Sequence, residues 1–220
     1  MKKLLFNILF IIITFPVVGQ VTAEFSTENR NGCAPFVVDF NNESTNASEF
    51  PTSYTWEFGN GVTSTELDPT YIYSQPGFYT VTLTTTNGID SDTEIKSALI
   101  RVNASPDPKL SVNSQNGCSP HTAEFSDLSI PQSGTITEWY WAFGNGETST
   151  EQNPITTYIE TKNYNVFLKV KDINGCEASV SKSDFIRLDN PQAKFVHGSV
   201  KCGLPSPVTF INKSTGNDLE

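Results

Sequence analysis

The chain has 220 residues, a formal net charge of −10 at pH 7 and only 17% charged residues. The acidic surplus argues against binding to nucleic acid or insertion against an anionic membrane surface, because both would repel it. Threonine, valine, phenylalanine and tyrosine, which favour strands, are plentiful, and the length allows one or two domains.

The amino terminus has the pattern of a secretory signal peptide. Lys2 and Lys3 precede an apolar run over 4–18, and the small residue Gly19 follows it. We therefore expect cleavage after residue 19 and export to the cell surface or beyond. The run is short and interrupted, so we expect no membrane insertion after cleavage, with an uncleaved anchor as the alternative.

The rest of the chain alternates apolar and polar residues with a period of two, which predicts strands with one buried face. The clearest runs of the first part are 36–40, 54–58 and 79–83. Turn signals rich in Gly, Asn and Pro separate the runs, at 31–32, 60–61, 75–77 and 87–88. Seven or so short strands in about 80 residues are typical of an immunoglobulin-like sandwich.

The chain also repeats itself. The hexapeptide WEFGNG at 56–61 returns as WAFGNG at 141–146, and Cys33 falls on Cys118 at the same spacing. A third copy begins at residue 193, where 202–215 resembles 33–45. A repeat of this kind indicates tandem units of one fold.

The repeated hexapeptide predicts a core element followed by a tight turn. Trp56 and Phe58 in one copy, and Trp141 and Phe143 in the other, alternate inward at the end of a strand. The glycines on either side of the asparagine supply the positive φ that a tight hairpin needs. This motif is therefore interpreted as structural and not catalytic.

The order of these motifs resembles that of the PKD (polycystic kidney disease) domain, whose hallmark is W-D-F-G-D-G. The resemblance is carried by NGCAP (31–35), WEFGNG (56–61) and PGFYTVTL (76–83), and by their second copies. It implies an all-β fold of tandem Ig-like sandwiches, two complete and one truncated. The hallmark's acidic positions hold Glu57 and Asn60 in one copy and Ala142 and Asn145 in the other, so we expect no metal site there.

The resemblance and the repeat spacing together predict the domain organisation. We expect a signal peptide at 1–19, PKD domains at 20–102 and 109–188, linkers at 103–108 and 189–192, and a truncated PKD domain at 193–220. The linkers contain proline and should be stiff. Two strands cannot bury a sufficient core, so we expect 193–220 to be poorly ordered.

The predicted function is non-catalytic. PKD domains of exported bacterial proteins act as spacers and as contact modules, which implies adhesion or a surface array, with a surface protein or polysaccharide as partner and a monomeric rod as the form. The alternative is that the repeats are accessory to a larger secreted hydrolase. We expect no enzyme activity, cofactor or metal, since His121 and His197 fall in no catalytic motif. The acidic turn at 87–94 is interpreted as a polar hairpin turn in preference to a calcium site.

Tyr140 and Phe167 form a candidate contact surface. The alternation of their strands turns both side chains outward, and the Ig-like order makes the two strands neighbours in one sheet. The first unit has Thr55 and Thr82 in these places. One interpretation is a cross-strand packing pair; the other is a contact site for a sugar ring or a protein partner.

The four cysteines allow three full pairings. Cys118 and Cys176 lie in the first and last turns of one unit, at opposite ends of the sandwich. A strand spans roughly 20 Å, whereas a disulfide needs Cα atoms within about 7 Å. The first turn of one unit should face the last turn of the next, which predicts an inter-domain Cys33–Cys176 bond, with unpaired thiols or an intra-unit bond as alternatives.

Ile89 stands in the first unit where Cys176 stands in the second, consistent with a first unit that has no predecessor to bond. By the same logic Cys118 and Cys202 stay unpaired here, and each would bond the last turn of a following unit. The hypothesis is a chain of disulfides that stiffens the array.

Overall fold

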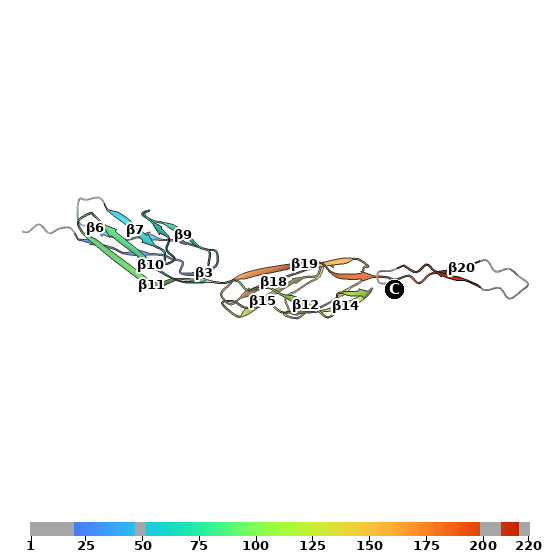
Figure 1. Ribbon diagram of the computed structural model, residues 1–220. Coiled ribbons are helices and arrows are strands. Elements are labelled where there is room, and N and C mark those ends of the chain that lie inside the picture. Colours follow the sequence, from blue (N-terminus) through green and yellow to red (C-terminus); the bar gives the residue numbers. More distant parts are fainter. Residues whose placement is uncertain (1–19, 47–51, 199–207, 216–220) are drawn as a thin grey trace, which may run out of the picture. The chain divides into compact units, whose positions relative to one another are not determined.

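The computed structural model describes residues 20–46, 52–198 and 208–215, all of them in strands, turns or irregular segments (Figure 1). The predicted signal peptide lies outside these ranges. None of the described residues forms a helix long and apolar enough to cross a membrane. The chain divides into two compact units. Unit 1 comprises Met1–Arg30, Val37–Tyr73 and Gly77–Arg101, and unit 2 comprises Asn31–Phe36, Ser74–Pro76 and Val102–Glu220.

The first repeat is built of eleven described strands. They are β1 (Val21–Thr22), β2 (Phe25–Ser26), β3 (Asn31–Cys33), β4 (Phe36–Asp39), β5 (Asn41–Asn42), β6 (Thr45–Asn46), β7 (Ser53–Glu57), β8 (Thr63–Ser64), β9 (Thr70–Tyr73), β10 (Gly77–Thr86) and β11 (Ser91–Asn103). One sheet has the order β3-β11-β10-β7-β8, and the remaining strands pair as β1–β6, β2–β5 and β4–β9.

The second repeat has the same arrangement. Its strands are β12 (Leu110–Val112), β13 (Asn116–Cys118), β14 (His121–Asp127), β15 (Ile136–Ala142), β16 (Thr148–Ser149), β17 (Ile155–Tyr158), β18 (Asn163–Asp172) and β19 (Glu177–Asp189). A sheet ordered β13-β19-β18-β15-β16 accompanies a three-stranded sheet ordered β12-β14-β17. The prediction of tandem all-β, Ig-like sandwiches is confirmed.

The expectation that every strand is short is wrong for the last two strands of each repeat. β10 and β18 have 10 residues each, and β11 and β19 have 13 each. The register of β18 against β19 shifts between Tyr164 and Val166, and Asp184 on β19 has a φ of 48°. The Asn165 side chain accepts the N–H of Asp184 at 2.8 Å. β19 therefore continues through a bulge, although its hydrogen bonding to β18 is interrupted there. The alternation of apolar and polar residues in the sequence does not reveal such a bulge.

The hexapeptide has the structural role that the sequence predicts. Trp56 and Trp141 are both 0% exposed, and Phe58 and Phe143 are buried beside them. Each indole N–H donates to a backbone carbonyl at 2.9 Å, at Glu66 and Glu151 respectively. The indole therefore fills the core without leaving its one polar atom unsatisfied.

A buried tyrosine closes the hexapeptide turn in each repeat. The Tyr73 hydroxyl donates to the Phe58 carbonyl at 3.2 Å, and the Tyr158 hydroxyl to the Phe143 carbonyl at 3.1 Å. Burial raises the pKa of both phenols far above the ordinary value of 10, with further contributions from neighbouring tyrosines. Both phenols therefore stay neutral in the folded state at any pH near neutrality.

These raised pKa values predict a loss of stability in alkali. Above pH 10 a tyrosine ionises in the unfolded chain but not at Tyr73 or Tyr158 in the fold, so the unfolded state binds fewer protons and the free energy of unfolding falls. The slope is up to about 1.4 kcal/mol per pH unit for each tyrosine, and the full stability is present below pH 10. We expect Tyr73→Phe and Tyr158→Phe to reduce this slope, and to cost about 1 kcal/mol at pH 7 through the lost hydrogen bond.

Urea unfolding between pH 8 and pH 11, in a Cys118→Ser, Cys202→Ser background that removes both predicted thiols, measures the slope. Tyr140→Phe, which removes a hydroxyl from an exposed side chain, is the control for the lost hydrogen bond and should cost less than about 0.5 kcal/mol at pH 7. An alkaline slope that is the same with and without Tyr73 and Tyr158 would contradict the assignment.

Beyond the second repeat the structure describes one pair of short strands. β20 (Phe195–His197) pairs antiparallel with β21 (Phe210–Asn212). The rings of Phe195 and Phe210 lie 5.5 Å apart, yet these side chains are 65% and 64% exposed. The poor order expected of 193–220 stays a prediction, and amide exchange of β20 and β21 measures it.

Candidate functional site

The titratable side chains of the described residues are dispersed. No group of three or more His, Cys, Asp and Glu side chains among them could hold a metal ion. His121 is half-buried with its Nε2 3.3 Å from the Ser114 carbonyl, and His197 is exposed. In the acidic turn, the Asp92 carboxylate accepts the Ala23 N–H at 2.9 Å. The Asn87 side chain accepts the N–H of Asp90 at 2.8 Å, as in a polar turn.

Tyr140 and Phe167 lie together on one face of the five-stranded sheet of the second repeat. β15 pairs antiparallel with β18, with Tyr140 opposite Lys169 and Ala142 opposite Phe167. The two rings are therefore diagonal neighbours, 6.4 Å apart and edge to face. Tyr140 is 41% exposed and Phe167 is half-buried.

Two ion pairs flank Tyr140. Lys169 lies 3.2 Å from the Glu177 carboxylate, and Lys171 lies 3.5 Å from that of Glu138. These four side chains, with Tyr140, line a shallow hollow of about 230 Å³. The face thus combines an aromatic pair with charged groups that can donate and accept hydrogen bonds.

The structure confirms the predicted disulfide. Cys33 is bonded to Cys176 across a sequence separation of 143 residues, with Cα atoms 5.5 Å apart. The topological argument against a Cys118–Cys176 bond within the second repeat also holds. β13 runs parallel to β19. Cys118, the last residue of β13, lies opposite Asp189, the last residue of β19. Cys176 directly precedes β19, so the strand's 13 residues, about 40 Å long, separate the two thiols.

A tight turn presents Cys176. The Asp172 carboxylate, itself only 2% exposed, accepts the N–H groups of Asn174 and Cys176 at 2.9 and 2.8 Å. The Asp172 N–H in turn donates to the Cys176 carbonyl at 2.9 Å, and Gly175 has the positive φ of 84° that closes the turn. We call residues 172–176 the cysteine turn.

An edge strand presents Cys33. Asn103, the last residue of β11 and 2% exposed, donates its side-chain amide to Asn31 Oδ1 at 2.7 Å and to the Gly32 carbonyl at 3.2 Å. The Asn103 carbonyl accepts the Ala34 N–H at 3.0 Å. These bonds hold β3 beside the end of β11. Residues 31–36 belong to unit 2, as does the cysteine turn.

Ser133 ties the beginning of the second repeat to the cysteine turn. Its hydroxyl accepts the Ala104 N–H at 2.7 Å, and its carbonyl accepts the Asn174 side-chain amide at 3.2 Å. Asp107 and Ile130 exchange two backbone hydrogen bonds of 2.9 Å. Part of the predicted linker 103–108 therefore pairs with the second repeat, although the domain bounds themselves stay a prediction.

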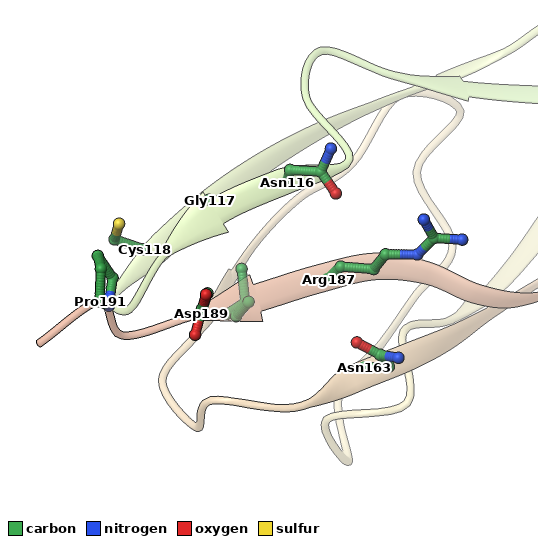
Figure 2. Close-up of a pocket in the computed structure, with 8 residues that line it drawn as sticks. Asn116, Gly117, Cys118, Asn163, Arg187, Asp189 and Pro191 are labelled. Atoms are coloured by element: carbon green, nitrogen blue, oxygen red, sulfur yellow. The ribbon is translucent and has the colours of Figure 1, made fainter. Parts of the chain in front are cut away.

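Cys118 is free and exposed, in a cleft at the end of β13 and β19. The cleft has a volume of about 550 Å³, and its lining includes Asn116, Cys118, Asn163, Arg187, Asp189 and Pro191 (Figure 2). Figure 2 shows the Cys118 sulfur at the tip of β13, near Pro191. The remaining predicted thiol, Cys202, lies outside the described residues.

Sequence reasoning found the cysteines but not the residues that position them. It missed Asp172, Asn103 and Ser133, because their roles depend on hydrogen bonds between distant segments. A faint signal exists for Asp172 alone, since the first repeat has Asn87 at the start of the same turn, and both side chains accept backbone N–H groups of that turn.

Comparisons with known proteins agree with the fold. The family model described as PKD domain matches residues 21–102 and again 103–187. Pre-pro-metalloprotease PrtV of Vibrio cholerae is 30% identical over 139 residues, which cover 59% of this chain and 14% of that protein. Collagenase ColQ1 of Bacillus cereus is 40% identical over 73 residues, which cover 32% of this chain and 8% of that protein. The chain thus spans a small part of the length of either relative.

Two solved structures of single domains are also similar. The PKD1 domain of Vibrio anguillarum Epp is 22% identical and covers 39% of this chain and 98% of its own, with a TM-score of 0.35. The PKD1 domain of the Vibrio cholerae metalloprotease PrtV is 26% identical and covers 38% and 96%, with a TM-score of 0.34.

Proposed function

The chain belongs to the PKD domain family, and from that premise we propose that it is a non-catalytic, exported protein whose tandem repeats act as a stiff spacer at the bacterial cell surface. The observation that carries the proposal is the Cys33–Cys176 disulfide. It joins the segment matched by the first PKD domain, 21–102, to the segment matched by the second, 103–187.

A second covalent connection changes how freely two domains can bend. The peptide connection alone runs through the few residues after Asn103, and a short connection still leaves its backbone dihedrals free to rotate. The disulfide adds a second tether at a different point, so a bending motion must satisfy both tethers at once. We therefore assign the disulfide to the stiffness of the array more than to the stability of either sandwich.

Cys33→Ser tests this assignment. We expect the variant to sample a broader distribution of maximum dimensions in small-angle X-ray scattering than the parent, while each sandwich keeps its own unfolding transition. Cys118→Ser, which removes a free thiol, is the matched control and should scatter like the parent. Non-reducing peptide mapping of the parent should yield the Cys33–Cys176 crosslink. A Cys118–Cys176 crosslink, or scattering that does not change in Cys33→Ser, would reject the stiff spacer.

A second candidate function is that these repeats are accessory to a larger secreted hydrolase. The relatives favour this candidate, because they are a metalloprotease and a collagenase. The matched segments make up only 14% and 8% of the length of these two proteins. Antibodies against the purified repeats would capture the native protein from its source for gelatin zymography. A captured protein that digests gelatin would support this candidate. A captured protein without proteolytic activity would contradict it and favour the spacer function.

We further propose that Tyr140 and Phe167 contact a polysaccharide or a surface protein during adhesion. An exposed ring offers a flat apolar face for a sugar, and the flanking Lys169 and Glu177 supply hydrogen bonds. The double variant Tyr140→Thr, Phe167→Thr copies the residues Thr55 and Thr82 of the first repeat.

We expect this double variant to weaken polysaccharide retention in affinity electrophoresis by about tenfold, which is about 1.4 kcal/mol. The complementary control is Thr55→Tyr, Thr82→Phe, which places the same pair on the first repeat and should not reduce retention. Retention that is unchanged in the Thr double variant would remove this surface from consideration and leave a simple packing pair.

A further inference from the structure

The end of the second repeat that carries Cys118 copies the end of the first repeat that carries Cys33. Asn116-Gly117-Cys118 on β13 corresponds to Asn31-Gly32-Cys33 on β3, and Arg187 near the end of β19 corresponds to Arg101 near the end of β11. β3 lies at the edge of its sheet beside β11, as β13 does beside β19. The two ends therefore offer the same backbone framework.

The two ends differ in what they hold. Cys33 is half-buried and bonded to Cys176, whereas Cys118 is exposed and free. Asn103 is buried, whereas its counterpart Asp189 is half-buried and lines the 550 Å³ cleft (Figure 2). One framework carries a cysteine turn, and the other has a cleft and a free thiol at the same place.

We propose that the cleft beside Cys118 is the acceptor site for the cysteine turn of a further PKD unit, with Cys118 as the bonding thiol. The site rests on the proposed function, since it extends the same disulfide chain. The occupant is defined by its chemistry: an Asp-x-Asn-Gly-Cys turn, as in 172–176. Within that turn the bonds from Asp172 to Asn174 and Cys176 are local, so any PKD unit with the same five residues presents its cysteine in the same way.

The walls of the cleft suit a polar turn better than an apolar ligand. Arg187 and the amides of Asn116 and Asn163 bring hydrogen-bond donors to the cleft, where a turn offers its outward carbonyl groups. The exchange of Asn103 for Asp189 replaces an amide donor by a carboxylate, one oxygen of which accepts the Asn190 N–H at 2.8 Å. The walls of the cleft are therefore polar and bring donors to an incoming turn.

The bond forms by oxidation of two thiols. The Cys118 thiol and the cysteine thiol of the turn lose two protons and two electrons as one S–S bond forms. A small disulfide such as oxidised glutathione takes up the electrons and protons as its own S–S bond breaks to two thiols. An exported protein meets such oxidants in oxidising compartments.

A three-repeat variant tests the site in the arrangement that already forms one disulfide. A second copy of residues 104–191, with its own Cys118 replaced by serine, is joined directly after Asp189, which reproduces the junction of Asn103 with Ala104. The variant is refolded with a mixture of reduced and oxidised glutathione and mapped without reduction. We expect two crosslinks, Cys33–Cys176 and Cys118 to the Cys176 of the added copy, and we expect Cys118 to lose its reactivity toward N-ethylmaleimide.

A matched control separates recognition from chance contact of thiols. In the same variant, Cys118→Ser combined with Lys162→Cys moves the thiol to an exposed residue at the same end of the repeat, outside the cleft, where the Lys162 carbonyl accepts the Leu188 N–H. We expect its crosslink to the added Cys176 to be at least about tenfold less populated than that of Cys118, corresponding to about 1.4 kcal/mol.

Three results would overturn the acceptor site. In the first, Cys118 carries glutathione while the added Cys176 is also unpaired. In the second, Cys118 bonds to the Cys118 of another molecule. In the third, Lys162→Cys crosslinks as fully as Cys118 does. The Cys33–Cys176 crosslink is read in the same digest. Its presence without the Cys118 crosslink rejects the acceptor site alone, and its absence rejects the proposed spacer itself.

Discussion

Trp141→Ala is expected to lower the free energy of unfolding of the second repeat by about 3–5 kcal/mol. The indole is fully buried and its ring lies 5.6 Å from Phe125 and 6.3 Å from Phe143. Its removal leaves a cavity in a core that cannot collapse easily, because strands on both sides are held by their ladders. It also orphans the Glu151 carbonyl, which accepts the indole N–H.

The effect should be confined to one repeat. Urea unfolding measures the loss, and amide exchange shows where it falls. Protection of Val166 and Leu168 on β18 should decrease, while that of Val81 and Leu83 on β10 should stay. The control is Tyr140→Ala, one residue earlier on the opposite face, which should cost at most about 1 kcal/mol, the upper end for a cross-strand pair. A loss below about 1 kcal/mol in Trp141→Ala would show that the indole does not organise the core.

Gly59→Ala is expected to destabilise the first repeat far more than Gly61→Ala. Both glycines flank Asn60 and have nearly the same positive φ, 82° and 85°. The left-handed conformation therefore costs both substitutions about 1–2 kcal/mol. Only Gly59 meets an obstacle, because a Cβ there would lie 2.4 Å from the Thr80 carbonyl oxygen, whereas nothing lies within 4 Å at Gly61.

The excess at Gly59 should be about 1–3 kcal/mol, the usual effect of overpacking, because a backbone atom and not a flexible side chain has to move. The second repeat offers an independent copy of the experiment. A Cβ at Gly144 would lie 2.6 Å from the Asn165 carbonyl oxygen, and one at Gly146 would meet nothing within 4 Å. Thermal unfolding of the four variants gives the two differences. If Gly59→Ala and Gly61→Ala, or Gly144→Ala and Gly146→Ala, lowered the stability equally, the close contact of the first glycine with the neighbouring strand would not be required.

The repeat of WEFGNG could be understood from the sequence because its causes are local. Trp and Phe two residues apart on a strand point to the same face, and glycine adopts a positive φ without steric cost. Alternation and turn signals therefore predicted the sandwich class, the buried rings of Trp56 and Trp141, and the outward direction of Tyr140 and Phe167. The same local reasoning missed the length of β11 and β19, since a bulge that continues a strand depends on the partner strand.

The pairing of Cys33 with Cys176 was within reach because topology limits it. Sequence spacing and the Ig-like strand order place Cys118 and Cys176 at opposite ends of one sandwich, and no local adjustment can bring them together. The sequence by itself thus determined the fold class and the repeat, and it favoured the Cys33–Cys176 pairing that the structure shows. Only the tertiary structure decided which groups hold those cysteines in place, the buried Asp172 and Asn103 and the hydroxyl of Ser133. It also decided that a cleft lies beside the free Cys118. The physical reason is that hydrogen bonds between segments far apart in the chain, and the space left between them, exist only once the strands have been brought side by side.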